Sequence, residues 1–155
     1  MTAKLPVSVL VVVHTSGREV LLLERTGTTG LWQSVTGSLD RADEPPAEAA
    51  RRELREETGI NARPADLRRW NLTYTFEIFA QWRHRFAPGT THNTEHVFSL
   101  ELPERVSAAL AADEHVGSVW LPWQEAAAKC FSWSNRDAIR IIGQCAGASV
   151  KSCAR

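Results

Sequence analysis

The sequence carries no excess of charge of either sign. Eighteen lysines and arginines balance eighteen aspartates and glutamates over 155 residues. Proteins that bind nucleic acid polymers through the phosphate backbone usually have a basic excess, and this chain has none. Any anionic ligand must therefore be held by a local group of basic residues.

Long hydrophobic runs are also missing. The apolar stretch VSVLVVVH at residues 7–14 is too short to cross a bilayer and lacks the small-residue cleavage pattern of a secretory signal. We therefore interpret it as a buried strand, and we expect no membrane partner.

Cysteine is scarce. Cys130, Cys145 and Cys153 are odd in number, lie late in the chain and do not fit the spacing of a metal site. This pattern suggests a reducing environment. We therefore assign the cysteines no chemistry and expect a cytoplasmic protein.

Repeats, low-complexity tracts and linkers are absent too, which favours a single domain. With 43% hydrophobic residues, a chain of this length can bury a sizeable core. We expect one domain at residues 1–147 and a frayed tail at residues 148–155, which is rich in Ala, Ser and Lys.

The first half of the chain predicts three strands and a helix. Residues 7–14 and 19–25 flank the turn signal TSGR and predict adjacent buried strands. A short Trp-containing strand follows in LWQSVTG, at residues 31–37. The proline pair at 45–46 and Gly59 then mark the two ends of a helix.

The second half predicts two long strands and two helices. RWNLTYTFEIFAQWRHRF, at residues 69–86, predicts one strand that pairs across the Pro88-Gly89 turn with THNTEHVFSLEL. Alternation along the first strand places these side chains on one face: Tyr74, Phe76, Ile78, Trp82, His84 and Phe86. Residues 123–129 and 134–145 predict helices. The pattern indicates an α/β fold with a mixed sheet sandwiched between helices.

The helix after the proline pair concentrates acidic residues. Glu53, Glu56 and Glu57 lie within an arc of about 100°, beside an apolar stripe that contains Leu54. Like charges four residues apart destabilise a helix by roughly 0.2 to 0.5 kcal/mol. Two interpretations remain open: a solvated face with ion pairs to Arg52, or a set of ligands for a hard divalent cation such as Mg²⁺.

The order of residues favours the second interpretation. A glycine, an acidic residue and the run RELREETGI resemble the signature of the Nudix family, whose members hydrolyse nucleoside diphosphates linked to another moiety. The matching residues are Gly37, Glu44, Arg52, Glu53, Leu54, Glu56, Glu57, Gly59 and Ile60. Six residues separate Gly37 from Glu44, where the usual pattern has five, so either the loop has one insertion or Asp43 replaces Glu44; we prefer the insertion.

The resemblance implies roles for the acidic residues. It makes Glu53 and Glu57 the primary ligands of Mg²⁺, with Mn²⁺ as a possible substitute, and Glu56 a further ligand. Arg52 would orient the carboxylates. Outside the signature, Glu114 matches the position of a further metal ligand or general base, with Asp113 and His115 as weaker alternatives.

Other segments resemble the branch of the family that removes pyrophosphate from dihydroneopterin triphosphate in bacterial folate synthesis. They are LWQSVTGSL, FEIFAQWRHRFAPGTTHNTEHVFSLELP and FSWSNRDAI. The resemblance implies substrate contacts from Lys4, Arg25, Thr36, Phe76, Glu77, Ile78, Phe79, Arg83, Arg85, Trp133, Ser134 and Asn135.

Each of these contacts has a structural alternative. Phe76 and Ile78 alternate with polar residues as core residues do, whereas Phe79 on the opposite face could stack on a flat ring. Arg83 and Arg85 would share one side of the strand, where they could bind phosphate or simply face solvent. Ser134 could instead cap the last helix.

We therefore predict a Mg²⁺-dependent pyrophosphohydrolase of dihydroneopterin triphosphate. One alternative keeps the chemistry but changes the substrate to dATP or an oxidised purine triphosphate, because pterin and purine are both fused rings. A second alternative, a non-catalytic nucleotide-binding module, would be expected to have lost carboxylates that RELREE retains.

Overall fold

The computed structural model describes residues 2–27, 29–111 and 113–145. The predicted tail at 148–155 and Cys153 lie outside these residues, so the predicted domain limits stay a prediction. In chain order the elements are β1 (Val7–Thr15), β2 (Glu19–Arg25), β3 (Trp32–Gln33), β4 (Val35–Ser38), α1 (Pro46–Thr58), η1 (Pro64–Asp66), β5 (Leu67–Glu77), η2 (Ala80–Arg85), β6 (His92–Leu102), β7 (His115–Pro122), α2 (Trp123–Lys129) and α3 (Trp133–Cys145). Within the described residues, no helix has the length and hydrophobicity that a membrane crossing requires.

The strands form one mixed sheet. The path β3-β2-β1-β6-β5 is hydrogen-bonded in that order, while β4 pairs with β1 and β7 pairs with β2. β1 and β6 are parallel from Val7 paired with Thr94 to Thr15 paired with Leu102, and the other pairs are antiparallel. The central strands are thus far apart in sequence.

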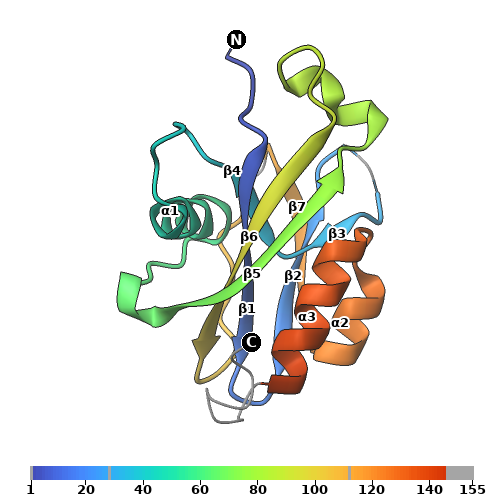
Figure 1. The fold of residues 1–155 in the computed structure, drawn as a ribbon. Helices are drawn as coiled ribbons and strands as arrows, with labels where there is room; N and C mark the ends of the chain where they lie inside the picture. Colours follow the sequence, from blue (N-terminus) through green and yellow to red (C-terminus); the bar gives the residue numbers. More distant parts are fainter. Residues whose placement is uncertain (1, 28, 112, 146–155) are drawn as a thin grey trace.

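Helices cover both faces of this sheet, as the sequence predicted (Figure 1). Alternate residues of β1 explain the two layers, since side chains along a strand point to opposite faces. Val9, Val11 and Val13 pack with Leu54 of α1. Leu10 and Val12 pack with Ala126 of α2, and with Ile139 and Ile142 of α3.

The ends of α1 are those that the sequence predicted. Pro46 begins the helix, where its missing N–H removes no hydrogen bond. Gly59 ends it with φ of 76°, and its N–H donates to Arg55 O at 2.8 Å. A glycine adopts this left-handed conformation without the strain that a Cβ would bring.

The long strand predicted at residues 69–86 is wrong in its second half. β5 ends at Glu77, and Ala80–Arg85 form a 3₁₀ helix. Phe79 and Trp82 turn toward Phe131, with ring centroids 5.9 and 5.8 Å from that ring. Packing of these aromatic rings replaces the strand ladder, so the alternation that put Arg83 and Arg85 on one side does not hold.

Other differences are small, except at the cysteines. The short strand in LWQSVTG is divided into β3 and β4, α2 has the predicted bounds, and α3 begins one residue earlier than predicted. Cys130 is a free, buried thiol, but Cys145 is disulfide-bonded.

Candidate active site

A cavity of about 830 Å³ lies where α1, β4, η2 and the start of α3 approach the sheet. Carboxylates of α1 form part of its wall, and side chains from the sheet face that packs against α3 form another part. One cavity therefore joins the acidic helix to the aromatic and polar residues of the second half of the chain.

The acidic residues of α1 differ in burial. Glu53 and Glu57 are 8% and 2% exposed, whereas the side chain of Glu56 is 51% exposed. Leu54, between them in sequence, is fully buried in the core. The helix thus anchors its apolar stripe under β1 and directs Glu53 and Glu57 into the cavity wall.

Gly37 of β4 allows this approach. A Cβ built on Gly37 would lie 2.0 Å from Glu53 Cδ and 2.3 and 2.5 Å from the carboxylate oxygens. Any side chain at this position would displace Glu53. The leading glycine of the sequence motif is therefore explained by the space that the Glu53 carboxylate occupies.

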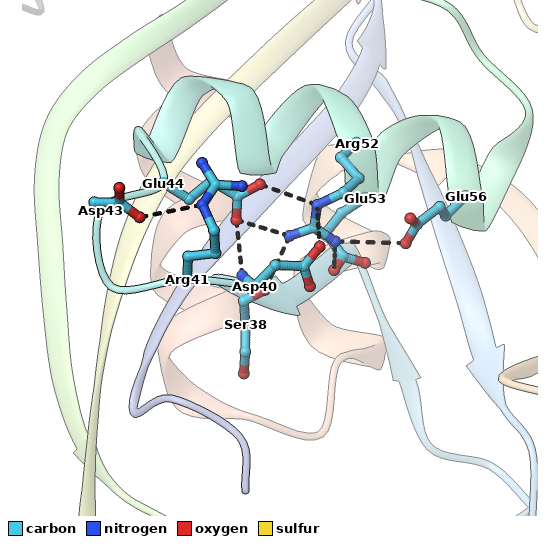
Figure 2. A network of polar contacts seen from close by, with 8 residues as sticks. All are labelled: Ser38, Asp40, Arg41, Asp43, Glu44, Arg52, Glu53 and Glu56. Atoms are coloured by element: carbon cyan, nitrogen blue, oxygen red, sulfur yellow. Dashed lines mark hydrogen bonds and ion pairs between the residues drawn. The ribbon is translucent and has the colours of Figure 1, made fainter. Parts of the chain in front are cut away.

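Arg52 is the centre of an ion-pair network (Figure 2). Its guanidinium donates to both carboxylate oxygens of Glu44 at 3.0 and 3.1 Å, to Glu53 Oε1 at 2.7 Å and to Ser38 O at 3.1 Å. Asp40 at 3.1 Å and Glu56 at 3.5 Å complete the network. The bidentate contact with Glu44 fixes the direction of the guanidinium, so Arg52 presents a fixed donor to one oxygen of the Glu53 carboxylate.

The same contacts settle which acidic residue of the loop matches the family pattern. Glu44 is buried, binds Arg52 and accepts the Asp40 N–H at 2.8 Å. Asp43 is 85% exposed and pairs with Arg41. Glu44 rather than Asp43 is thus the partner of Arg52, which supports the interpretation of one inserted loop residue.

Glu57 lies in a second acidic group with Glu114 and His115. One ligand atom from each of the three lies within 4.8 Å of the others. Glu57 Oε2 accepts the Thr36 N–H at 3.1 Å, and Oε1 lies 3.8 Å from His115 Nε2. Glu114 immediately precedes β7 and is exposed.

Burial changes the protonation of these groups. It raises the pKa of Glu53 to about 7 and that of Glu57 well above its usual range, with a further rise from neighbouring carboxylates. Burial also lowers the pKa of His115, which favours the neutral imidazole. Within the described residues, no arginine or lysine forms an ion pair with Glu57.

These residues fit a divalent cation. Mg²⁺ and Mn²⁺ prefer carboxylate oxygens, and a bound cation would relieve the repulsion among Glu53, Glu57 and Glu114. The Nδ1 atom of His115 is buried without a hydrogen-bond partner among the described residues, and its Nε2 accepts a hydrogen bond from Gln33 Nε2 at 3.4 Å. The donor set therefore supports the predicted metal ligands, whereas half-exposed Glu56 needs to turn from Arg52 to join them.

Besides Arg41 and Arg52, which form ion pairs with acidic residues of the loop and α1, three cations line the cavity: Lys4, Arg25 and Arg85. Burial and the charge of Arg85 lower the pKa of both Lys4 and Arg25. Cations that repel one another in a partly dry site are typical of an anion-binding group. The structure thus brings together the local basic group that the neutral net charge required.

An aromatic wall closes the cavity near η2. The predicted residues Phe76, Ile78 and Phe79 line it, and so do Trp82 and Phe131, which were not among the predicted substrate contacts. Phe79 and Trp82 meet edge to face at 5.3 Å, and Arg25 lies 4.5 Å from the Trp82 ring centroid. Alternation had placed Trp82 on the same face as Phe76 and Ile78, but a 3₁₀ turn rather than an extended strand brings it to this wall.

Ser134 and Asn135 also line the cavity, and both are buried. The alternative of Ser134 as the helix cap is wrong, because α3 begins at Trp133 and Ser132 Oγ accepts the Asn135 N–H at 3.3 Å. Asn135 is already paired: its side chain accepts from Ser34 N at 2.8 Å and donates to Ser34 Oγ at 3.1 Å.

Three predicted contacts lie outside the cavity wall. Glu77 and Arg83 form an ion pair with each other, and Arg83 also donates to Ile78 O at 3.0 Å. Trp133 is 51% exposed and packs edge to face on Tyr74 at 5.5 Å. Their roles as substrate contacts stay a prediction without support from the cavity geometry.

Comparisons with known proteins find relatives over most of the chain. A family model for the NUDIX domain matches residues 4–140. Dihydroneopterin triphosphate diphosphatase of Escherichia coli (strain K12) is 44% identical over 139 residues, which cover 88% of this chain and 91% of that protein. The protein of the same name from Haemophilus influenzae is 37% identical over 136 residues, or 86% of this chain and 84% of that protein.

A solved structure extends the comparison to the fold. The structure of the E. coli dihydroneopterin triphosphate pyrophosphohydrolase matches with a TM-score of 0.84 and 42% sequence identity. The match covers 90% of this chain and 96% of that chain. Sequence and fold thus resemble the same proteins over nearly their whole length.

Proposed function

This chain belongs to the Nudix family, and from that premise we propose that it hydrolyses dihydroneopterin triphosphate to dihydroneopterin monophosphate and pyrophosphate. The observation that carries the proposal is that one cavity is lined by the carboxylates of α1, by the cations Lys4, Arg25 and Arg85, and by an aromatic wall. The names of the E. coli and H. influenzae relatives support the pterin substrate.

The geometry suggests separate roles for the cations and the carboxylates in the reaction. Lys4, Arg25 and Arg85 would bind the phosphate oxygens and hold the triphosphate of the substrate against α1. Arg52 would keep Glu53 oriented, and Glu53 and Glu57 would hold the metal ion. A bound Mg²⁺ supplies charge neutralisation and lowers the pKa of a water molecule.

Glu114 is the best placed proton acceptor. Its carboxylate is exposed and lies next to Glu57, so a water molecule can reach it. Attack of that water on a phosphorus atom breaks one P–O–P bond, the water proton passes to the carboxylate, and pyrophosphate leaves. His115 is a weaker candidate, since its ring is buried.

The proposal includes the setting of the reaction. We propose Mg²⁺ as the working metal with Mn²⁺ able to replace it, on the basis of the oxygen-rich donor set. We also propose a cytoplasmic enzyme that acts on a small triphosphate rather than on a nucleic acid polymer, which the balanced charge of the chain supports. A purine triphosphate such as dATP is the second candidate substrate, because the aromatic wall can stack on any fused ring.

The purified protein tests the proposal when it is incubated with dihydroneopterin triphosphate and Mg²⁺. We expect equimolar pyrophosphate and monophosphate, and we expect Glu57→Gln to lower kcat by at least about 100-fold. Glu48→Gln is the matched control, since Glu48 is an exposed residue of the same helix that pairs with Arg51. Release of single phosphate, or full activity of Glu57→Gln, would contradict the proposed reaction.

A further inference from the structure

Two buried hydrogen-bond acceptors in the cavity have no role in the reaction described above. Glu95 and Asn93 line the cavity and are only 5% and 6% exposed. Within residues 2–27, 29–111 and 113–145, neither Glu95 Oε1 nor Asn93 Oδ1 has a hydrogen-bond partner. Buried polar atoms without partners are rare, and each one calls for an explanation.

The sheet register places both side chains on the face that packs against α3. They are two residues apart on β6, so they point the same way, and Glu95 pairs with Ser8 of β1 and with Tyr74 of β5. Phe76, a residue of the aromatic wall, is opposite Asn93. The two acceptors are therefore next to the ring-stacking part of the cavity.

Neighbouring hydroxyl groups fix the orientation of these acceptors. Asn93 Nδ2 donates to Ser8 Oγ at 2.8 Å, which leaves its Oδ1 as the unpaired atom. Ser8 and Ser134 donate hydrogen bonds to the Glu95 carboxylate, and its Oε1 has no such donor. Three elements, β1, β6 and α3, thus hold two acceptors in place without satisfying them.

The charge of Glu95 is uncompensated as well. No arginine, lysine or histidine of the described residues forms an ion pair with it, and the hydroxyl of Tyr74, which is opposite Glu95 on β5, donates to Asp137 instead. Burial raises the pKa of Glu95 to about 7. A buried carboxylate without a cation destabilises a fold, so its presence in a cavity wall points to a ligand that supplies donors.

We propose that Glu95 and Asn93 recognise the ring N–H and the exocyclic amino group of a 2-amino-4-oxo pyrimidine ring, the edge that pterin shares with guanine. Two adjacent donors on the ligand would meet two unpaired acceptors on the protein, while the aromatic wall stacks on the ring faces. Adenine has an amino donor beside a ring nitrogen that carries no hydrogen. That ring nitrogen would face the Glu95 carboxylate, so two acceptors would meet without a hydrogen bond. The inference rests on the proposed function only for the triphosphate end of the substrate.

Binding of the ring alone tests the inference without the reaction. The probes are pterin and lumazine, which differ in that lumazine has a carbonyl group in place of the 2-amino group. With EDTA present, we expect the wild type to bind pterin at least about 10-fold tighter than lumazine, and Glu95→Gln to lose that preference. Equal affinity of the wild type for both probes, or an unchanged preference in Glu95→Gln, would overturn the inference.

Turnover gives a second readout with a matched control. Glu95→Gln should lower kcat/KM for dihydroneopterin triphosphate by about 30-fold or more and change that for dATP by less than about 3-fold. Glu101→Gln, an exposed residue of the same strand, should change neither. Equal losses on both substrates would indicate a merely structural Glu95 and contradict the inference.

The outcomes separate the two proposals. Glu95-dependent binding of pterin by a protein that releases no pyrophosphate would contradict the proposed function and leave the inference standing. Normal hydrolysis with no effect of Glu95→Gln on selectivity would contradict the inference and leave the proposed function standing. Circular dichroism checks the fold of the variant, and if Glu95→Gln does not fold, Asn93→Ala should show the same loss of preference for pterin over lumazine.

Discussion

Gly37 shows how one residue controls the geometry of the metal site. Its missing side chain leaves the space that the Glu53 carboxylate occupies, 2.0 Å from where a Cβ would be. The neighbouring atoms belong to the flexible end of a glutamate rather than to backbone, so the fold can adapt by turning Glu53 away. A turned Glu53 would leave both Arg52 and the cavity.

We expect Gly37→Ala to lower kcat by at least about 100-fold while the melting temperature changes by only a few degrees. Gly17→Ala is the control, because its nearest neighbouring atom would be at an ordinary 3.7 Å and its activity should stay normal. Steady-state assays and thermal melts of both variants check this. Full activity of Gly37→Ala would show that Glu53 does not need its present position.

The buried carboxylate of Glu95 also affects the pH dependence of stability. Its proton leaves at about pH 4.5 in the unfolded chain and at about pH 7 in the folded protein, because burial disfavours the charged form. Between these values the folded state binds more protons, so this group makes stability fall as pH rises and leaves it lowered above pH 7.

Glu95→Gln should therefore be more stable than the wild type above pH 7, by up to roughly 3 kcal/mol, and the gain should vanish below about pH 4.5. Urea unfolding at pH 4.5, 6 and 8 measures the difference. Stability of the variant equal to or below that of the wild type at pH 8 would show that the protein already compensates the buried charge.

At the scale of secondary structure, α1 and the loop before it act as one unit. Arg52 of the helix binds Glu44 of the loop and Glu53 of the helix with the same guanidinium (Figure 2). The hydrogen bond from Arg52 holds the pKa of Glu44 below its usual range. Since the folded pKa is lowered, this contact stabilises the fold above about pH 4.5 and loses its effect as pH falls through the folded value.

Glu44→Gln should reduce kcat by about 10-fold and the free energy of unfolding at pH 7 by about 1 to 2 kcal/mol, because Arg52 loses a charged, bidentate partner. Asp43→Asn, one residue earlier and exposed, should behave as the wild type. Steady-state kinetics and urea unfolding of both variants measure these effects. Equal effects of the two substitutions would contradict the assignment of Glu44 as the partner of Arg52.

The elements also show where sequence reasoning succeeds. The caps of α1, its buried Leu54 and its acidic residues were predictable because they depend on neighbours within one helix. The 3₁₀ turn at Ala80–Arg85 was not, because it depends on Phe131, about fifty residues along the chain from Phe79. Residues such as Trp82 enter the cavity only through that contact.

For the whole molecule, the pairing of β1 with β6 creates the cavity. It places Ser8 beside Glu95, which is far away in sequence, and sets both against α3. No local pattern marks Glu95 or Asn93, since an acid and an amide that alternate with other residues are typical of any strand with one solvated face. Their burial follows from the tertiary fold, whereas the metal-binding helix could be predicted from order along the chain.

We infer that one cavity binds a pterin ring at one wall and cleaves a triphosphate at the other. The most direct test is kcat/KM of the wild type with Mg²⁺ for dihydroneopterin triphosphate and for dATP, measured by pyrophosphate release. We expect kcat/KM for dihydroneopterin triphosphate to be at least about 10-fold higher than that for dATP. An equal or higher value for dATP would contradict it.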